Sequence, residues 1–219
     1  VIIRDTAEQA SALVAELVAR CIRARPSLVL GLATGRTMER LYDELVRKYE
    51  RGEIDFSLVK TFNLDEYIGL PPEDENSYRS YMNRNLFHRV NIDPRNTFLP
   101  NGMAEDIEEE CEQYERNIAE SGGIDLQILG IGRSGHIGFN EPLSAMRSRT
   151  RAKALSPQTI EQNAPFFGGP DRMPKRAITM GVGTILDAKR CVLLATGQEK
   201  AEVIARAVEG PVTSMISAT

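Results

Sequence analysis

The chain contains 219 residues, of which 42% are hydrophobic and 26% are charged, a balance typical of a folded globular protein. Its 31 acidic residues and its 27 lysines and arginines give a net charge of −4, which provides no basic excess for sequence-independent binding of nucleic acid. The longest apolar runs, such as residues 28–32, are far too short to cross a bilayer. Nucleic acid and membrane are therefore excluded as expected partners.

Short apolar runs alternate along the chain with segments of helical periodicity. The first helix is predicted to follow the capping residues Asp5 and Thr6 and to run to about Arg23. This alternation predicts a three-layer α/β/α fold around a mostly parallel, Rossmann-like sheet. Strands are expected at 27–32, 58–64, 125–131, 177–180 and 191–195, and further helices at 38–49, 107–118 and 203–208.

No linker divides the chain, so residues 1–219 are expected to form a single domain. Residues 138–175 show weak periodicity, and loops of that length in compact domains usually act as lids or binding loops. Cations at alternate positions in this stretch indicate either a protected edge strand or a second anion site. These cations are Arg147, Arg149, Arg151 and Lys153.

Ligands of open parallel sheets bind beyond the carboxyl ends of the strands. After the first strand, a helix is expected to begin in the run Thr34, Gly35, Arg36 and Thr37. Free N–H groups at a helix N-terminus favour an anion, and phosphate is the usual one. A simple helix cap by Thr37 is the alternative. Lys200 begins a later helix and is a candidate for a second phosphate contact.

Two further polar segments follow strands and are expected at the same edge of the sheet. His136 lies between glycines and is followed by Glu141, a carboxylate that would orient the imidazole for acid–base work. Asp65 stands where the second strand ends. The alternatives are a histidine that binds loop backbone groups and an aspartate that caps a turn. Together, the three residues indicate proton transfer on a small phosphorylated substrate.

The sequence predicts neither a cofactor nor a metal. The glycines at 130, 132 and 135 match the dinucleotide fingerprint, but Gly138 and Pro142 interrupt the helix that should follow. Only two histidines are present, so a site with several histidine ligands is excluded. The three cysteines are far apart and lie in apolar-periodic segments. We interpret them as reduced core residues of a cytoplasmic protein.

These segments together resemble the glucosamine-6-phosphate deaminase family, also called the isomerase/deaminase family. The string Gly135–Pro142, Gly-His-Ile-Gly-Phe-Asn-Glu-Pro, is highly specific for it. Related sugar-phosphate lactonases share the fold but carry a Gly-His-Thr-type motif without Asn-Glu-Pro. The other matching segments cover nearly the whole chain in order: Leu30–Gly35, Thr61–Leu70, Ser77–Tyr78, Ser148–Arg151, Gly181–Leu186 and Lys200.

The resemblance implies a hydrolase of amino-sugar metabolism that converts glucosamine 6-phosphate and water into fructose 6-phosphate and ammonia. His136, with Glu141 as its partner, would assist opening of the pyranose ring, and Asp65 would move a proton from C2 to C1. Residues 151–175 match a segment that acts as a lid. The family's phosphate-binding positions match Thr34, Gly35, Thr37 and Lys200. Positions that bind an allosteric activator between subunits in some members match Ser144, Arg151 and Lys153.

Four features depart from the family pattern. Ser134 stands two residues before the histidine, where the family has Asp or Asn. Pro165 replaces a lid arginine that binds phosphate in many members, and Arg36 replaces a Gly or Ser of the phosphate loop. We hypothesise that Arg36 takes over the role of the lid arginine. The family pattern continues through a further strand and helix beyond Thr219, so a truncated chain is expected.

Several alternatives stay open at this stage. The substrate of a deaminase could be galactosamine 6-phosphate, and members of the family occur as monomers and as hexamers, so a homo-oligomer is one option. A lactonase of the same fold is disfavoured by Asn140–Pro142. A non-catalytic sugar-phosphate sensor would not need Asp65, His136 or Glu141, and all three are present.

Overall fold

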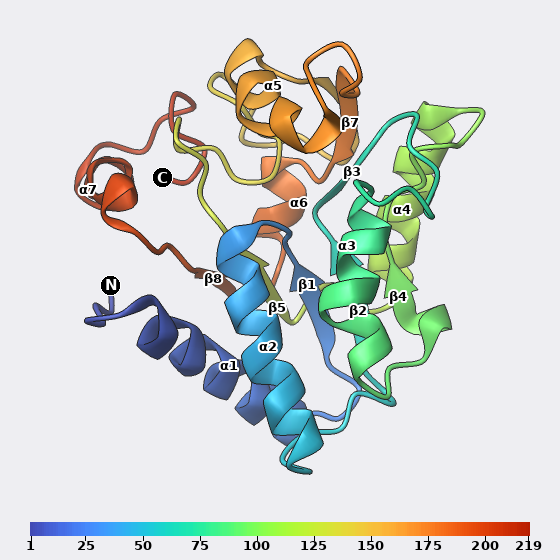
Figure 1. Ribbon diagram of the computed structural model, residues 1–219, viewed down its shortest axis with the longest axis vertical. Helices are drawn as coiled ribbons and strands as arrows, with labels where there is room; N and C mark the ends of the chain where they lie inside the picture. The colour runs from blue at the N-terminus through green and yellow to red at the C-terminus, as the bar shows by residue number, and fades with distance from the viewer.

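The computed structural model describes all 219 residues, and its centre is a parallel sheet of five strands in the order β4-β2-β1-β5-β8 (Figure 1). Four of these strands fall where the sequence predicts them, and the two-residue β4 is additional. The expectation of a mostly parallel, Rossmann-like sheet is confirmed. The strands are β1 (Val29–Leu32), β2 (Lys60–Asn63), β4 (Thr97–Phe98), β5 (Leu126–Leu129) and β8 (Cys191–Leu193).

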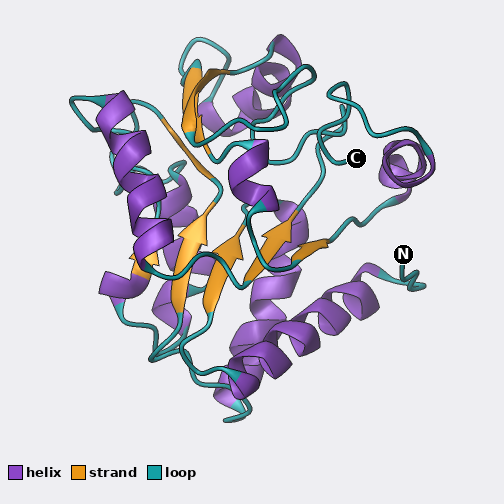
Figure 2. Cartoon of the chain, turned by 180° about the vertical axis from the view of Figure 1, so that it is seen from behind, coloured by secondary structure: helices purple, strands orange, loops and turns teal.

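Helices cover the sheet, as Figure 2 shows, and complete the predicted three layers. The first helix begins after Thr6, whose hydroxyl accepts a hydrogen bond from the backbone N–H of Gln9 at 3.2 Å. The predicted N-terminal cap is therefore confirmed. The helices are α1 (Ala7–Ala24), α2 (Arg36–Glu50), α3 (Tyr78–Asn85), α4 (Ile107–Glu120), α5 (Pro157–Asn163), α6 (Val182–Leu186) and α7 (Ala201–Glu209).

The main hydrophobic core lies between this sheet and its helices and contains 34 buried residues. Leu30 and Leu32 of β1 are fully buried because β1 is flanked by β2 and β5. On α2, Leu41, Tyr42 and Leu45 are fully buried, as the helical spacing of apolar residues requires. Burial of these side chains holds the carboxyl ends of the strands in fixed positions, and the candidate site lies there.

A second sheet corrects two expectations from the sequence. It is antiparallel, in the order β3-β7-β6, so the predicted strand at 177–180 is not part of the parallel sheet. Only Leu64 separates β2 from β3, and the chain passes there directly from one sheet into the other. Residues 138–175 are not all loop, because they contain β6 and α5. The strands are β3 (Asp65–Tyr67), β6 (Arg151–Ala154) and β7 (Arg176–Thr179).

Two further expectations can be compared with the structure. β6 lies at the edge of its sheet, which confirms the edge-strand interpretation for Arg151 and Lys153. The interpretation is wrong for Arg147 and Arg149, which precede the strand; Arg149 instead pairs with Glu115 and Asp187. All three cysteines are unpaired, but Cys191 is exposed on the edge strand β8 and does not belong to the core. No helix combines the length and the apolar character that crossing a membrane would require.

Candidate active site

The parallel strands bring the polar segments that follow them to one edge of the sheet, as expected. The Thr37 hydroxyl, after β1, lies 3.2 Å from the Thr196 hydroxyl, after β8. The Lys200 ammonium donates a hydrogen bond to the carbonyl of Ile131, after β5, at 2.8 Å. The segment that follows β8 therefore contacts the segments that follow β1 and β5.

The N-terminus of α2 is free to receive an anion. The helix begins at Arg36, and Gly35 before it has φ 116°, a conformation that favours glycine. No side chain caps the first turn, so the interpretation of Thr37 as a simple helix cap is wrong. Thr34 and Thr37 are half-buried beside the uncapped N–H groups. This arrangement suits a phosphate, since N–H groups, hydroxyls and the helix dipole converge on it.

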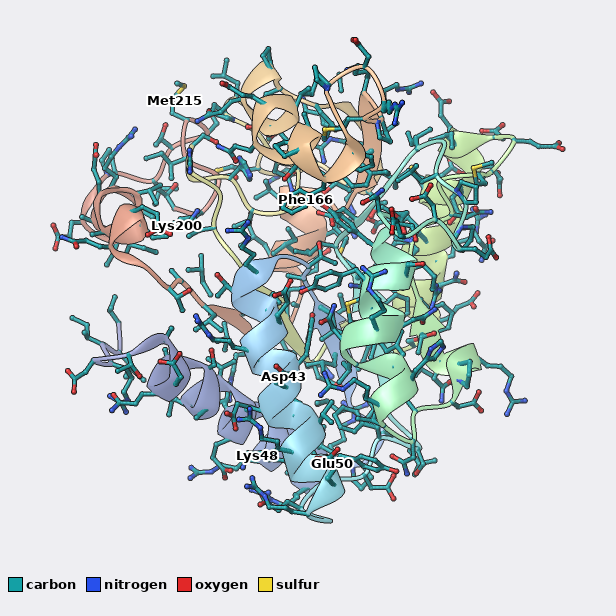
Figure 3. All side chains as sticks on the ribbon, in the orientation of Figure 1. Asp43, Lys48, Glu50, Phe166, Lys200 and Met215 are labelled. Carbon is teal, nitrogen blue, oxygen red and sulfur yellow. The ribbon has the colours of Figure 1, made fainter.

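Two cations come from the segments that meet at this edge, Arg36 at the start of α2 and Lys200 after β8. The Arg36 side chain is exposed, and its guanidinium carbon lies 6.0 Å from the ring centroid of Phe166. Figure 3 shows Phe166 below the turn that follows α5, facing the N-terminal end of α2. Lys200 is half-buried, and burial lowers its pKa, an effect that Arg133 reinforces and Glu199 opposes.

Asp65 opens β3 and is 6% exposed. Burial, reinforced by the charge of the neighbouring Glu66, raises the pKa of its carboxyl to about 8, and no hydrogen bond offsets these effects. A buried carboxylate without partners is a stronger base than an ordinary aspartate, whose pKa is about 3.9. Asp65 is therefore suited to remove a proton from carbon.

His136 is held at one ring nitrogen by two side chains of its own loop. Its Nδ1 atom lies 2.8 Å from the Ser134 hydroxyl and 3.2 Å from Oε2 of Glu141. A Cβ atom at Gly132 would collide with the imidazole, so that position requires glycine. The contacts at Nδ1 fix the ring and leave Nε2 as the nitrogen that can exchange protons with a ligand.

Glu141 links this loop to the segment after β6. Its Oε1 atom accepts hydrogen bonds from the hydroxyls of Ser156, at 2.8 Å, and Thr159, at 2.5 Å. Although burial alone would raise the pKa of Glu141, hydrogen bonds from His136, Thr159 and Ser156 lower it to about 2. The carboxylate thus stays charged beside the imidazole over the whole working range of pH.

Asp65 and the histidine loop meet through the second sheet. Asp65 pairs with Thr179 of β7, and the Thr179 hydroxyl accepts the backbone N–H of Phe139 at 3.1 Å. A Cβ atom at Gly138 would lie 3.3 Å from Oδ2 of Asp65, so the loop backbone passes directly beside this carboxylate. The structure therefore places the Asp65 carboxylate beside the loop that carries His136 and Glu141.

Sequence reasoning missed an aromatic wall and the role of Glu66. Tyr67, Tyr78 and Phe139 pack on one another, and the Tyr78 ring is nearly parallel to that of Phe139 at 6.3 Å. Glu66 accepts backbone N–H bonds from Tyr67, Tyr78 and Arg79, each at 2.9 Å, which fixes the start of α3. The two consecutive acidic residues after β2, Asp65 and Glu66, were the only sequence signal for the role of Glu66.

The three positions expected to bind an activator do not form an obvious common site. The buried Ser144 hydroxyl donates to the carbonyl of Glu141 at 2.7 Å. Arg151 donates to the side-chain oxygen of Asn140 at 2.9 Å, while Lys153 follows two residues later on the same strand. Their role in regulation stays a prediction.

Comparison with known proteins identifies the family. Residues 3–218 match the family model described as glucosamine-6-phosphate isomerases/6-phosphogluconolactonase. The chain belongs to this family. The match covers both sheets and all the candidate residues of the site described above.

Individual members of the glucosamine-6-phosphate isomerase/6-phosphogluconolactonase family agree with this assignment. The glucosamine-6-phosphate deaminase of Thermoanaerobacter sp. (strain X514) is 50% identical over 219 residues, which are 100% of this chain and 87% of that protein. That of Clostridium perfringens (strain 13 / Type A) is 49% identical over 218 residues, 100% of this chain and 90% of the relative. A solved monomeric glucosamine-6-phosphate deaminase superposes with a TM-score of 0.96 at 44% identity, covering 98% of this chain and 89% of the other.

Proposed function

We propose that this chain is a deaminase that converts glucosamine 6-phosphate and water into fructose 6-phosphate and ammonia. Relatives that are about 50% identical over the whole chain are named glucosamine-6-phosphate deaminase. The observation that carries the proposal is the unpartnered, buried Asp65 carboxylate, with its raised pKa, beside the loop that holds His136 and Glu141.

The phosphate of the substrate is proposed to bind at the N-terminus of α2. The uncapped N–H groups, the Thr34 and Thr37 hydroxyls and the helix dipole favour a dianion there. Lys200 supplies one positive charge and Arg36 a second. Remote binding of this kind orients the sugar so that its reacting carbons lie at the carboxylate.

His136 is proposed to open the pyranose ring by moving a proton between the O1 hydroxyl and the ring oxygen. Glu141 stabilises the imidazolium that forms, and the Ser134 hydroxyl forms a hydrogen bond with the same ring nitrogen, Nδ1. Ring opening yields the free aldehyde at C1, next to the C2 carbon that carries the amino group. This step makes the C2 proton acidic enough for a carboxylate base.

Asp65 then removes the C2 proton and returns it to C1, through an enolamine. The C1–C2 unit is left with a hydroxymethyl group and a C2 imine. Water adds to C2, the C–N bond breaks, and ammonia leaves with the ketone of fructose 6-phosphate. Even with its raised pKa, a carboxylate is a weak base toward a C–H proton, so the negative charge that develops on oxygen must be stabilised within the site.

Residues 151–175 are proposed to act as a lid over this site. The segment already touches the site at two places, because Ser156 and Thr159 bind Glu141 and Phe166 faces Arg36. Closure over the sugar would exclude water from the charged groups and strengthen their interactions.

The unpaired cysteines are consistent with a reducing compartment, so we place the reaction in the cytoplasm.

The test is ammonia release from glucosamine 6-phosphate by the parent chain and by its Asp65→Asn variant. Release that is lost in the variant supports both the reaction and the base. Release from galactosamine 6-phosphate alone would assign the other amino sugar. No release from either, with the sugar phosphate still raising the melting temperature, would favour a sensor, and hydrolysis of a sugar-phosphate lactone would favour a lactonase.

A further inference from the structure

The chain's last seven residues, Thr213–Thr219, form a compact turn that packs on the loop of His136. The turn is closed by its own hydrogen bonds, because the Thr219 hydroxyl accepts the N–H of Thr213 at 2.9 Å and donates to the carbonyl of Ile216 at 2.8 Å. We call residues 213–219 the brace. Ile216 is its buried anchor, at 5% exposure.

Backbone groups of the brace bind both ends of the loop that carries His136, residues 135–143. The Ala218 N–H donates to the carbonyl of Gly135, one residue before His136, at 3.0 Å. The Leu143 N–H, two residues after Glu141, donates to the carbonyl of Ser214 at 2.7 Å. Leu143 has φ 70°, in the left-handed region that a leucine rarely adopts, so this contact holds a strained residue in place.

The Ser217 hydroxyl makes the central contact. Its oxygen accepts the backbone N–H of Ile137 at 3.2 Å and donates to the backbone carbonyl of Asn140 at 2.7 Å. Ile137 follows His136 directly, and Asn140 directly precedes Glu141. One hydroxyl therefore fixes the separation between the two backbone positions that carry the imidazole and its carboxylate.

The loop needs such a contact because of its own composition. Gly135 and Gly138 both have positive φ, of 83° and 54°, and glycines leave a backbone with more conformational freedom than other residues. Hydrogen bonds from the Asn140 side chain hold one side of the loop, to the carbonyls of Ile137 and Met180. On the other side, Ile216 packs its side chain on Gly135, and the Ser217 hydroxyl makes the only side-chain hydrogen bonds from the brace to the loop.

We propose that Ser217 is a positioning residue, which sets the geometry of the His136–Glu141 pair without touching the substrate. The inference rests on the proposed function, because the pair is needed for ring opening. A side chain that acts in this way affects the rate of the chemical step more than the binding of the phosphate, which lies at the start of α2. Misplacement of catalytic groups by about 1 Å can lower rates by roughly 100-fold.

The experiment compares Ser217→Ala with Ser214→Ala and Ser217→Thr. Ser214 lies in the same brace, but it contacts Leu143 through its backbone carbonyl, which alanine retains. We expect Ser217→Ala to lower kcat about tenfold or more at unchanged KM. Ser214→Ala should match the parent, and Ser217→Thr, which keeps the hydroxyl, should recover most of kcat.

Amide hydrogen exchange gives a readout that does not depend on activity. In Ser217→Ala the N–H of Ile137 should exchange faster, while amides of β1 stay protected as in the parent. An unchanged kcat, or a loss equal to that of Ser214→Ala, would overturn the positioning role. So would unchanged exchange at Ile137. If the parent releases no ammonia, the proposed function fails, and the exchange result still decides whether Ser217 holds the loop.

Discussion

The guanidinium of Arg36, at the first residue of α2, lies 6.0 Å from the ring centroid of Phe166, in the turn after α5. This contact joins the proposed phosphate site to the proposed lid. Many members of the family that the sequence resembles have a phosphate-binding lid arginine at the position of Pro165. Here a positive charge reaches the same region from the opposite side, which supports the hypothesis that Arg36 takes over the role of that arginine.

Arg36→Ser should therefore weaken substrate binding. We expect KM for the phosphorylated sugar to rise about tenfold or more with little change in kcat, because a charge-assisted contact to phosphate contributes roughly 1.5–3 kcal/mol. Steady-state kinetics measure this split. Arg40→Ser is the matched control, since Arg40 lies one turn later on α2 and pairs with Glu8 at 3.4 Å. If KM stayed at the parent value in Arg36→Ser, the hypothesis would be wrong.

Asp65→Asn should abolish activity and stabilise the protein. A general base typically contributes about 100-fold or more to the rate, and its loss removes that contribution. The Asp65 carboxyl has a pKa of about 8 in the folded state and about 3.9 when unfolded, so folding favours its protonated form. The parent therefore loses stability as the pH rises from about 4 to 8, and the neutral amide does not.

Thermal unfolding at several pH values measures this effect. The difference in melting temperature between variant and parent should be small at pH 4, grow toward pH 8, and level off above it. For a chain of this length, about 1 kcal/mol corresponds to roughly 2–4 °C. A variant that is less stable than the parent at pH 8 would mean that Asp65 has an ionic partner in the folded state.

The parallel sheet was predictable because its signals are local. Four of its strands and the main helices follow from runs and spacings such as Leu41, Tyr42 and Leu45 on α2. The polar segments after the strands followed from the topology, since the carboxyl ends of parallel strands share one edge. Asp65, His136 and Lys200 could thus be singled out without a structure.

The second sheet was not predictable in the same way, because its strands are short and pair over long separations. β3 pairs with β7 more than 100 residues later, as Glu66 opposite Ile178 shows. Such pairing leaves no periodic pattern in a strand of three residues. The contact of Ser217 with Ile137 and Asn140 is likewise a tertiary one, and a lone serine in a polar turn carries no signal for it.

The two partners of the imidazole should differ in importance. Glu141→Gln removes the charge that stabilises the imidazolium, so we expect kcat to fall by about 100-fold or more. Ser134→Ala removes the hydroxyl contact to Nδ1 at 2.8 Å and a long hydrogen bond to Oε2 of Glu141 at 3.4 Å, but it leaves the carboxylate in place, so a loss of less than tenfold is expected. The comparison uses kcat at saturating substrate. An equal loss in both variants would show that Ser134 is as necessary as the carboxylate.

The pH dependence of the reaction should report the charge of Glu66. Burial and then Glu66 raise the pKa of Asp65 to about 8, so kcat/KM should increase with pH up to that region. The charged or titratable groups around this pair are Arg79 and four tyrosines, Tyr42, Tyr67, Tyr78 and Tyr114. In Glu66→Gln the negative charge is absent, so the pKa of Asp65 falls and the acid limb of the kcat/KM profile moves to lower pH.

Two measurements separate this electrostatic effect from a loss of structure. Glu66 also accepts three backbone N–H bonds, and the glutamine oxygen replaces only part of them, so the melting temperature of Glu66→Gln should fall. A purely structural loss would lower kcat/KM equally at every pH. Glu73→Gln, which removes the same charge from an exposed loop, should leave the acid limb where it is. An acid limb that does not move in Glu66→Gln would mean that burial alone sets the basicity of Asp65.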